Sequence, residues 1–138
     1  MNKEAARKIS EFVRLCDYDE QGKLLHAVVP GHEAQWYQVE FDRQRQTPNS
    51  LPTVRCHCHN SDEGEQCKGN RHGVCYHSLG ALIAAAKKKG FALILCETLA
   101  DAQSVLALVK THIVQVTSKQ SGKSVFAVHR PLDKGKKT

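Results

Sequence analysis

Residues 55–79 constrain this protein more than any other stretch, because they concentrate side chains that bind metal. This stretch holds four of the six cysteines and four of the eight histidines. Its outer members form two short pairs, Cys56-His57-Cys58 and Cys75-Tyr76-His77, with 16 residues between them. Thiolate and imidazole ligands of this kind suit a tetrahedral zinc ion. The pattern therefore predicts one structural Zn2+, bound by Cys56, Cys58, Cys75 and His77.

The two pairs are expected to come from different kinds of element. Alternate side chains of an extended strand point to the same face, so Cys56 and Cys58 would present both sulfurs on one side. In a helix, the same spacing would separate Cys75 and His77 around the axis. We therefore expect Cys75 just before a helix and His77 in its first turn. The positive end of that helix would favour the thiolate.

Three further candidates for the metal site lie between the pairs. Cys67, His59 and His72 could replace a ligand or bind a second ion. The spacing of Cys67 to either pair follows no common zinc pattern, so we interpret these three residues as spectators. A disulfide switch between Cys56 and Cys58 is the redox alternative.

The CxC…CxH pattern resembles the SWIM zinc finger. The matching residues are Cys56, Cys58, Cys75 and His77, and the resemblance covers about residues 34–90. Aromatic residues before the first pair and leucines after the second pair also fit, namely Trp36, Tyr37, Phe41, Leu79 and Leu82. The resemblance implies strands followed by a helix around structural zinc. It also implies that the finger binds DNA or other proteins and catalyses nothing itself.

Hydrophobic periodicity predicts helices and strands on both sides of the metal-binding stretch. Helices are expected over residues 3–16, over 78–89 and from 98 onward. Strands are expected over residues 24–29, 35–41, 53–58, 91–96, 112–117 and 124–129. The first three strands would be antiparallel, and the last two would form a hairpin. The expected fold is α+β, a small antiparallel sheet with helices and a zinc knuckle joining a strand end to a helix start.

A chain of 138 residues suits one α+β domain. We divide it into an N-terminal helix with the first strand (1–33), a SWIM-like finger (34–90), a C-terminal αβ extension packing on the same domain (91–132) and a disordered basic tail (133–138). Zinc would fix both ends of the polar loop between the two ligand pairs, which cannot bury enough apolar surface to hold itself.

The net charge of +6 is distributed unevenly. Residues 1–52 carry seven Lys/Arg and eight Asp/Glu (−1), residues 53–90 carry six and three (+3), and residues 91–138 carry seven and three (+4). Such a surplus is compatible with contacts to phosphates. The candidates closest to the metal-binding stretch are Arg55, Lys68, Arg71, Lys87, Lys88 and Lys89. We therefore favour nucleic acid as the partner, DNA before RNA, with a protein partner as the alternative.

Signals for an enzyme are weak. A nucleobase deaminase needs HxE with PCxxC, and the chain has neither. A nuclease site built on His57, His59, Asn60 and His72 would need an open metal coordination position, which a Cys3His set lacks. We expect no catalytic residue and no small-molecule substrate.

The N-terminal sequence MNKEAARKIS lacks the apolar run of a secretory signal. No apolar stretch reaches the roughly 20 residues that a membrane helix needs. Clustered thiols suit a reducing compartment. These features predict an intracellular protein, cytoplasmic or nuclear, that is neither secreted nor embedded in a membrane.

Overall fold

The computed structural model describes residues 2–31, 35–42, 53–60, 67, 73–109 and 111–132. In chain order, the described elements are α1 (Lys3–Ser10), β1 (Leu15–Tyr18), β2 (Leu24–Pro30), β3 (Trp36–Phe41), β4 (Thr53–Asn60), α2 (Tyr76–Lys88), β5 (Phe91–Cys96), α3 (Leu99–Val109), β6 (Ile113–Ser118) and β7 (Ser124–Pro131). None of these described helices is long and apolar enough to cross a membrane.

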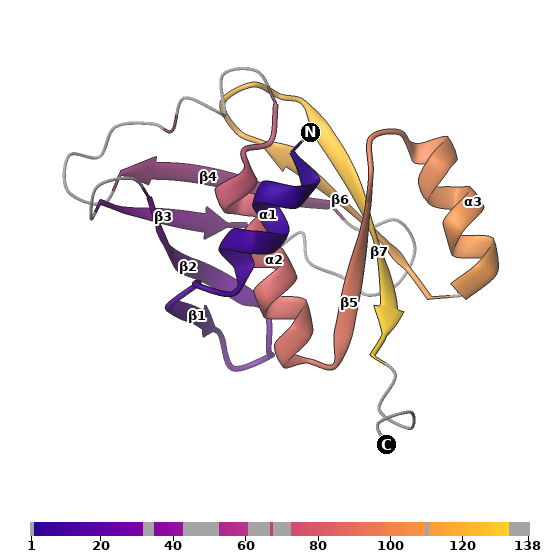
Figure 1. Cartoon of the computed structure of the whole chain (residues 1–138), viewed down its shortest axis with the longest axis horizontal. Helices are drawn as coiled ribbons and strands as arrows, with labels where there is room; N and C mark the ends of the chain where they lie inside the picture. Colours follow the sequence, from indigo (N-terminus) through magenta and orange to yellow (C-terminus); the bar gives the residue numbers. More distant parts are fainter. Residues whose placement is uncertain are drawn as a thin grey trace.

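All seven strands join one curled sheet, in the order β1-β2-β3-β4-β6-β7-β5 (Figure 1). Every neighbouring pair is antiparallel except β4 and β6, which run parallel. A parallel pair needs a crossover, and here the chain between the two strands contains α2, β5 and α3. The α+β class is confirmed, but the sheet is mixed and larger than the antiparallel sheet we expected. Residues 1–33, 34–90 and 91–132 all contribute strands to it.

Local sequence signals explain where the helices begin and end. Asn2 caps α1 by accepting a hydrogen bond from the backbone N–H of Ala5 at 3.0 Å. Thr98 does the same before α3, where its Oγ1 accepts from the N–H of Asp101 at 3.1 Å. Gly90 follows α2 with φ of +90°, the left-handed conformation that glycine adopts most readily.

The N-terminal helix is shorter than its apolar stripe predicted. It ends at Ser10, and residues 15–18 form β1, which pairs antiparallel with β2. In this pairing Cys16 lies opposite Ala27, and its side chain packs against the main core. A helical and a strand arrangement both bury Cys16, so periodicity alone could not separate them, and pairing with β2 decides the outcome.

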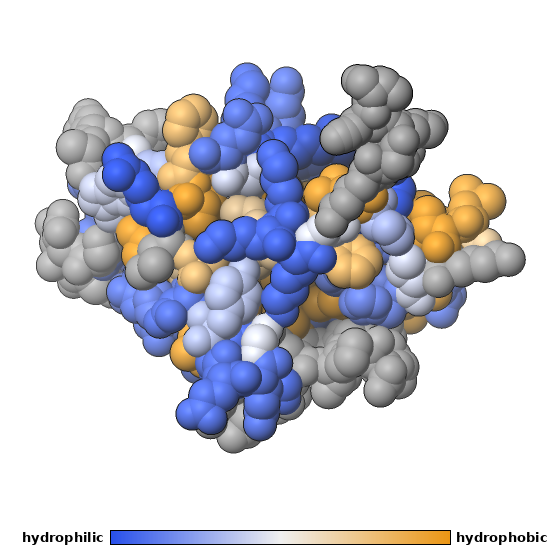
Figure 2. All heavy atoms as spheres, turned by 90° about the horizontal axis from the view of Figure 1, so that it is seen from below, coloured by the Kyte–Doolittle hydropathy of each residue, from blue (hydrophilic) through white to orange (hydrophobic). Residues whose placement is uncertain are grey.

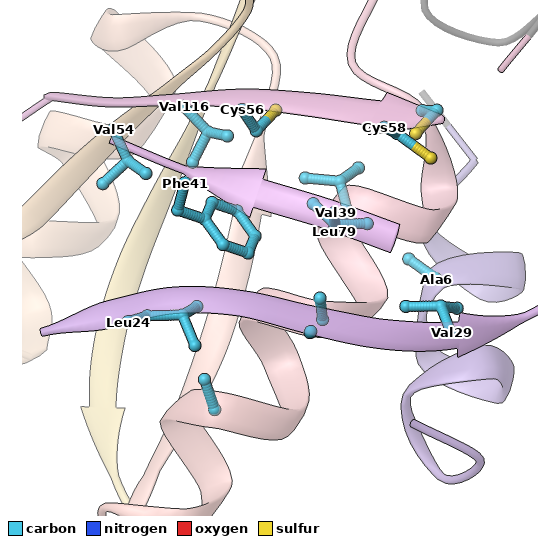
Figure 3. Close-up of a cluster of buried hydrophobic side chains, with 14 of the residues drawn as sticks. Ala6, Leu24, Val29, Val39, Phe41, Val54, Cys56, Cys58, Leu79 and Val116 are labelled. Carbon is cyan, nitrogen blue, oxygen red and sulfur yellow. The ribbon is translucent and has the colours of Figure 1, made fainter. Parts of the chain in front are cut away.

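The main core lies between the sheet and the helices α1 and α2. Its largest fully buried side chains include Val29, Val39, Leu79 and Val116, which come from β2, β3, α2 and β6 (Figure 3). The two helices touch closely at Gly80, where an added Cβ would lie 2.2 Å from Cγ2 of Ile9. Glycine at this position lets α1 lie directly against α2.

A second, smaller core lies under α3. It contains Cys96, Ala102, Ile113 and Val128, with Phe126 packed against them. On β7, Val125 and Ala127 belong to the main core instead, so alternate residues of one strand serve opposite faces. The part of the sheet formed by β5, β6 and β7 therefore has helices on both sides.

Candidate metal centre

The strand side of the centre is the end of β4. Val39 pairs with Cys58, and Phe41 pairs with Cys56, so the strand is regularly paired through both cysteines. Both side chains are fully buried in the main core, on the side that faces Val39 and Leu79 (Figure 3). The expectation that the two sulfurs share one face is confirmed.

The helix side of the centre is the start of α2. Cys75 is the N-cap residue, in extended conformation, and its Sγ accepts a hydrogen bond from the N–H of Ser78 at 3.4 Å. His77 lies in the first turn and is buried. The predicted placement of Cys75 before the helix and His77 inside it is confirmed.

Cys67 completes the cluster. Its backbone N–H donates to the carbonyl of Cys58 at 3.0 Å, which holds it beside the end of β4. Its Sγ lies 3.4 Å from Nδ1 of His77. One ligand atom from each of four buried residues lies within 4.8 Å of all the others: Cys58, Cys67, Cys75 and His77. The structure thus brings together a Cys3His set, with Cys67 where we expected Cys56.

The regular pairing of β4 explains why Cys56 stays outside this set. The Cα atoms of residues two apart on a strand lie roughly 6.6 Å apart, whereas sulfurs on one tetrahedral zinc lie about 3.8 Å apart. Two such thiols reach one ion only if both side chains lean toward each other. Cys56 instead hydrogen bonds to Ser78, and burial is the main cause that raises the pKa of its thiol to about 12.

The electrostatics of the cluster favour a bound cation. Hydrogen bonds to Cys67 and Cys75, together with burial, raise the pKa of Cys58 far above its usual range. Hydrogen bonds from Cys58 and Cys75 lower the pKa of Cys67. Burial lowers the pKa of His77, but hydrogen bonds to Cys67 and Cys75 outweigh it and raise that pKa to about 9. The raised pKa keeps the Cys58 thiol protonated in the protein alone, and a positive ion beside it would favour its thiolate.

Two tyrosines orient the imidazole of His77. Its ring stacks on Tyr37 of β3 with centroids 4.3 Å apart and planes at 21°, and it contacts Tyr76 at the same centroid distance. With Nδ1 turned toward Cys67, the buried Nε2 has no hydrogen-bond partner within the described residues. Nδ1 is therefore the nitrogen placed to bind a metal.

Zinc fits this donor set. In a tetrahedral site with Zn–S of about 2.3 Å and Zn–N of about 2.1 Å, neighbouring ligand atoms lie roughly 3.5–3.8 Å apart. The 3.4 Å between Cys67 Sγ and His77 Nδ1 is close to that range, and the 4.8 Å limit for the whole set allows it. Three thiolates and one imidazole form a common structural zinc set.

The turn between β6 and β7 closes against the strand side of the centre. The N–H of Lys119 donates to the carbonyl of Cys56 at 2.9 Å, and the side-chain amide of Gln120 hydrogen bonds to His57. Ser121 Oγ donates to the carbonyl of Gly73, two residues before Cys75, at 3.0 Å. The C-terminal hairpin therefore contacts two of the segments that carry the ligands, β4 and the residues just before α2.

The histidines that alternate with the cysteines of β4 lie on its other face. His59 Nε2 donates to the Glu40 carboxylate at 2.8 Å. The ring of His57 is 5.1 Å from that of His59, and burial together with this neighbour lowers the pKa of His57. Neither belongs to the Cys3His set, and His72 lies outside the described residues.

Of the basic residues predicted to contact nucleic acid, those that the structure describes lie on two sides of the sheet. Arg55 is exposed on β4 and alternates with the buried cysteines, so it points away from α2. Lys87, Lys88 and Lys89 are exposed at the C-terminal end of α2, on the other side of the sheet. Lys68 and Arg71 lie outside the described residues.

Comparisons with known proteins add no family to this picture, because no family model, curated protein or solved structure matches the chain. The resemblance to SWIM fingers therefore depends on the CxC and CxH residues alone. What the structure itself supports is a possible metal-binding Cys3His group within a seven-stranded α+β fold.

Proposed function

We propose that this protein is a zinc-stabilised, non-catalytic binding module. One observation carries this proposal: the four candidate ligand residues are all buried, and one ligand atom of each lies within 4.8 Å of all the others. A catalytic zinc keeps one coordination position for water or substrate, whereas a structural zinc has four protein ligands. The ion would join the end of β4, Cys67 and the start of α2 into one rigid junction.

The partner we propose is single-stranded nucleic acid, with DNA as the first candidate. The supporting surface is the face of β3 and β4 that points away from α1 and α2; α3 packs at the other end of the sheet (Figure 1). This face carries Arg55 and Trp36, and the guanidinium of Arg14 lies 5.1 Å from the Trp36 ring centroid. Aromatic rings and cations on one surface bind bases by stacking and phosphates by charge.

A fluorescently labelled oligo-dT strand, titrated with the zinc-loaded protein, tests this proposal. We expect binding that weakens steeply between about 50 mM and 200 mM salt, because phosphate contacts release counterions. Arg55→Ala should weaken binding several-fold, and Lys87→Ala, on the opposite side of the sheet, is the matched control that should change it little. Binding without salt dependence, or an equal loss in both variants, would count against this surface.

A protein partner is the second candidate, and two observations favour it. Glu40 lies on the same sheet face and would repel phosphate, although it pairs with His59. Leu108 on α3 is 82% exposed, which is unusual for a large apolar side chain. Absence of any oligonucleotide binding at low ionic strength would make this candidate the preferred one.

A further inference from the structure

The end of α2 opposite the metal centre borders a cavity of about 350 Å³. Apolar side chains from the sheet and the helix form its walls, among them Leu24, Val54, Leu82, Leu93 and Val116. Polar groups stand around it: Tyr18, Lys23, Lys89, His112 and His129. Seen from below, this side of the molecule has hydrophobic surface between hydrophilic residues (Figure 2). Apolar walls with a few polar groups are typical of a small-molecule site.

Two polar atoms around the cavity lack a partner. The hydroxyl of Tyr18 and Nδ1 of His129 are buried and have no hydrogen bond to any residue that the structure describes. Native proteins pair nearly all such atoms, since an unpaired buried donor or acceptor is destabilising. Both residues line the same cavity, and turning either side chain toward it would let a ligand oxygen pair with the atom that lacks a partner.

The charges around the cavity are of one sign. Its described lining contains two lysines, Lys23 and Lys89, and neither aspartate nor glutamate. Burial lowers the pKa of both lining histidines, so their rings are neutral at neutral pH. Lys89 is held in place, because its ammonium donates to the carbonyl of Gly22 and lies 5.2 Å from the Tyr18 ring centroid. His129 stacks on His112 with centroids 4.1 Å apart. Burial, with the charges of His112 and Lys89, lowers the pKa of His129 to about 4, as expected where a negative charge is missing.

We propose that this cavity binds a small amphipathic monocarboxylate, with its carboxylate near Tyr18, Lys89 and His129 and its hydrocarbon part against the apolar walls. A volume of about 350 Å³ holds roughly a dozen non-hydrogen atoms. An acid of that size has enough apolar surface to fill the cavity and one anionic group to match its charge. This site is independent of the zinc centre and of the nucleic-acid surface proposed above.

Octanoate and 1-octanol test the proposal, because they share the hydrocarbon chain and differ in charge. Each is titrated into the zinc-loaded full chain and followed by amide chemical shifts. We expect octanoate to give saturable shifts at Tyr18, Lys89 and His129, with at least about tenfold higher affinity than 1-octanol. No saturable shift, or equal affinity for both probes, would overturn the proposal.

Variants locate the carboxylate. Lys89→Met keeps the length of the side chain and removes its charge, so it should lower octanoate affinity about tenfold while leaving 1-octanol unchanged. Lys88→Met is the matched control, since Lys88 is the exposed neighbour that does not line the cavity. An equal loss of octanoate affinity in both variants would mean that only the overall positive charge of the protein matters. That result would overturn the proposed site.

The ring of His129 provides a second readout that needs no variant. A bound carboxylate would favour the protonated imidazole and offset the nearby charges of His112 and Lys89. The pKa of His129, measured from its ring proton shifts, should therefore rise when octanoate is present. An unchanged His129 pKa at saturating octanoate would place the anion elsewhere and overturn the proposed geometry.

Discussion

The two ends of α2 show two ways in which one helix organises polar groups. At its N-terminal end, Cys75 and His77 belong to a buried Cys3His cluster that could hold a metal ion. At its C-terminal end, basic residues border a cavity where Tyr18 and His129 have polar atoms without partners in the described structure. The helix dipole favours anionic thiolates at the first end and cations at the second. The comparison separates a site that would hold metal from one that would hold an anion.

Removing zinc should disrupt only the Cys3His cluster at the N-terminal end of α2. This is the largest effect that we expect. Apparent zinc binding contributes about 10–16 kcal/mol in small zinc fingers. A strong chelator at neutral pH should therefore lower the melting temperature by more than about 10 °C, and Cys58→Ala should act in the same direction. Unchanged thermal unfolding after verified metal removal would contradict a structural role for the ion.

Two cysteine variants test which residues bind the metal at the N-terminal end of α2. Cys67→Ala should lose stoichiometric zinc and destabilise the fold by about 3 kcal/mol or more, because it opens the tetrahedral set. Cys56→Ala should keep one zinc per chain and cost only about 1–2 kcal/mol for the small cavity that it leaves. Metal content by atomic emission and the spectrum of the cobalt-substituted protein check both. Zinc loss in Cys56→Ala with retention in Cys67→Ala would restore the ligand set expected from the CxC motif.

Gly80→Ala tests the helix that connects the two ends. The new Cβ would clash with Cγ2 of Ile9 and approach the carbonyl of Ala6 at 3.1 Å. Such overpacking should destabilise the protein by about 1–3 kcal/mol in urea unfolding. Gly73→Ala is the control, since an added Cβ there meets no described residue within 4 Å and should change stability by less than about 0.5 kcal/mol. A neutral Gly80→Ala variant would mean that α1 can shift away from α2 at little cost.

Acid should destabilise the protein through His129, which lines the cavity at the C-terminal end of α2. The pKa of His129 is lowered from 6.5 to about 4, so between these values the unfolded chain binds a proton that the folded chain does not. The free energy of unfolding should therefore fall as pH drops from 6.5 to 4, by about 1–2 kcal/mol after solvent screening. Urea unfolding of His129→Phe across this range should show a shallower fall than the wild type. Parallel curves would show that His129 does not contribute, because acid effects on the zinc ligands are common to both proteins.

The Cys3His cluster at the N-terminal end of α2 was largely predictable from the sequence. Alternation on a strand placed Cys58, and the helix signals placed Cys75 and His77. Cys67 was named as a candidate but interpreted as a spectator, because its position depends on how the chain returns to the carbonyl of Cys58, which no local spacing encodes. The available signal was distance: two cysteines separated by one residue on a regular strand reach one tetrahedral ion only if their side chains lean toward each other.

The cavity at the C-terminal end of α2 could not be predicted from the sequence. It brings together the β1–β2 hairpin, the end of α2 and residues of β5, β6 and β7. Tyr18 and His129 are 111 positions apart in the chain, and only the sheet order makes them line one space. For the same reason the parallel pairing of β4 with β6 was missed, since periodicity identifies a strand but not its neighbour.

The turn from Lys119 to Ser121 bears on where this chain can be cut. A fragment ending near residue 90 would retain all four candidate ligands and look like a complete finger. It would nevertheless lose the backbone bond to Cys56, the contact with Gly73 and the whole of β6. Strand β4 would then become an unprotected edge beside its own metal site, a typical starting point for aggregation. Expression of such a fragment should give insoluble protein even with zinc supplied, whereas a chain that extends through β7 keeps the edge covered.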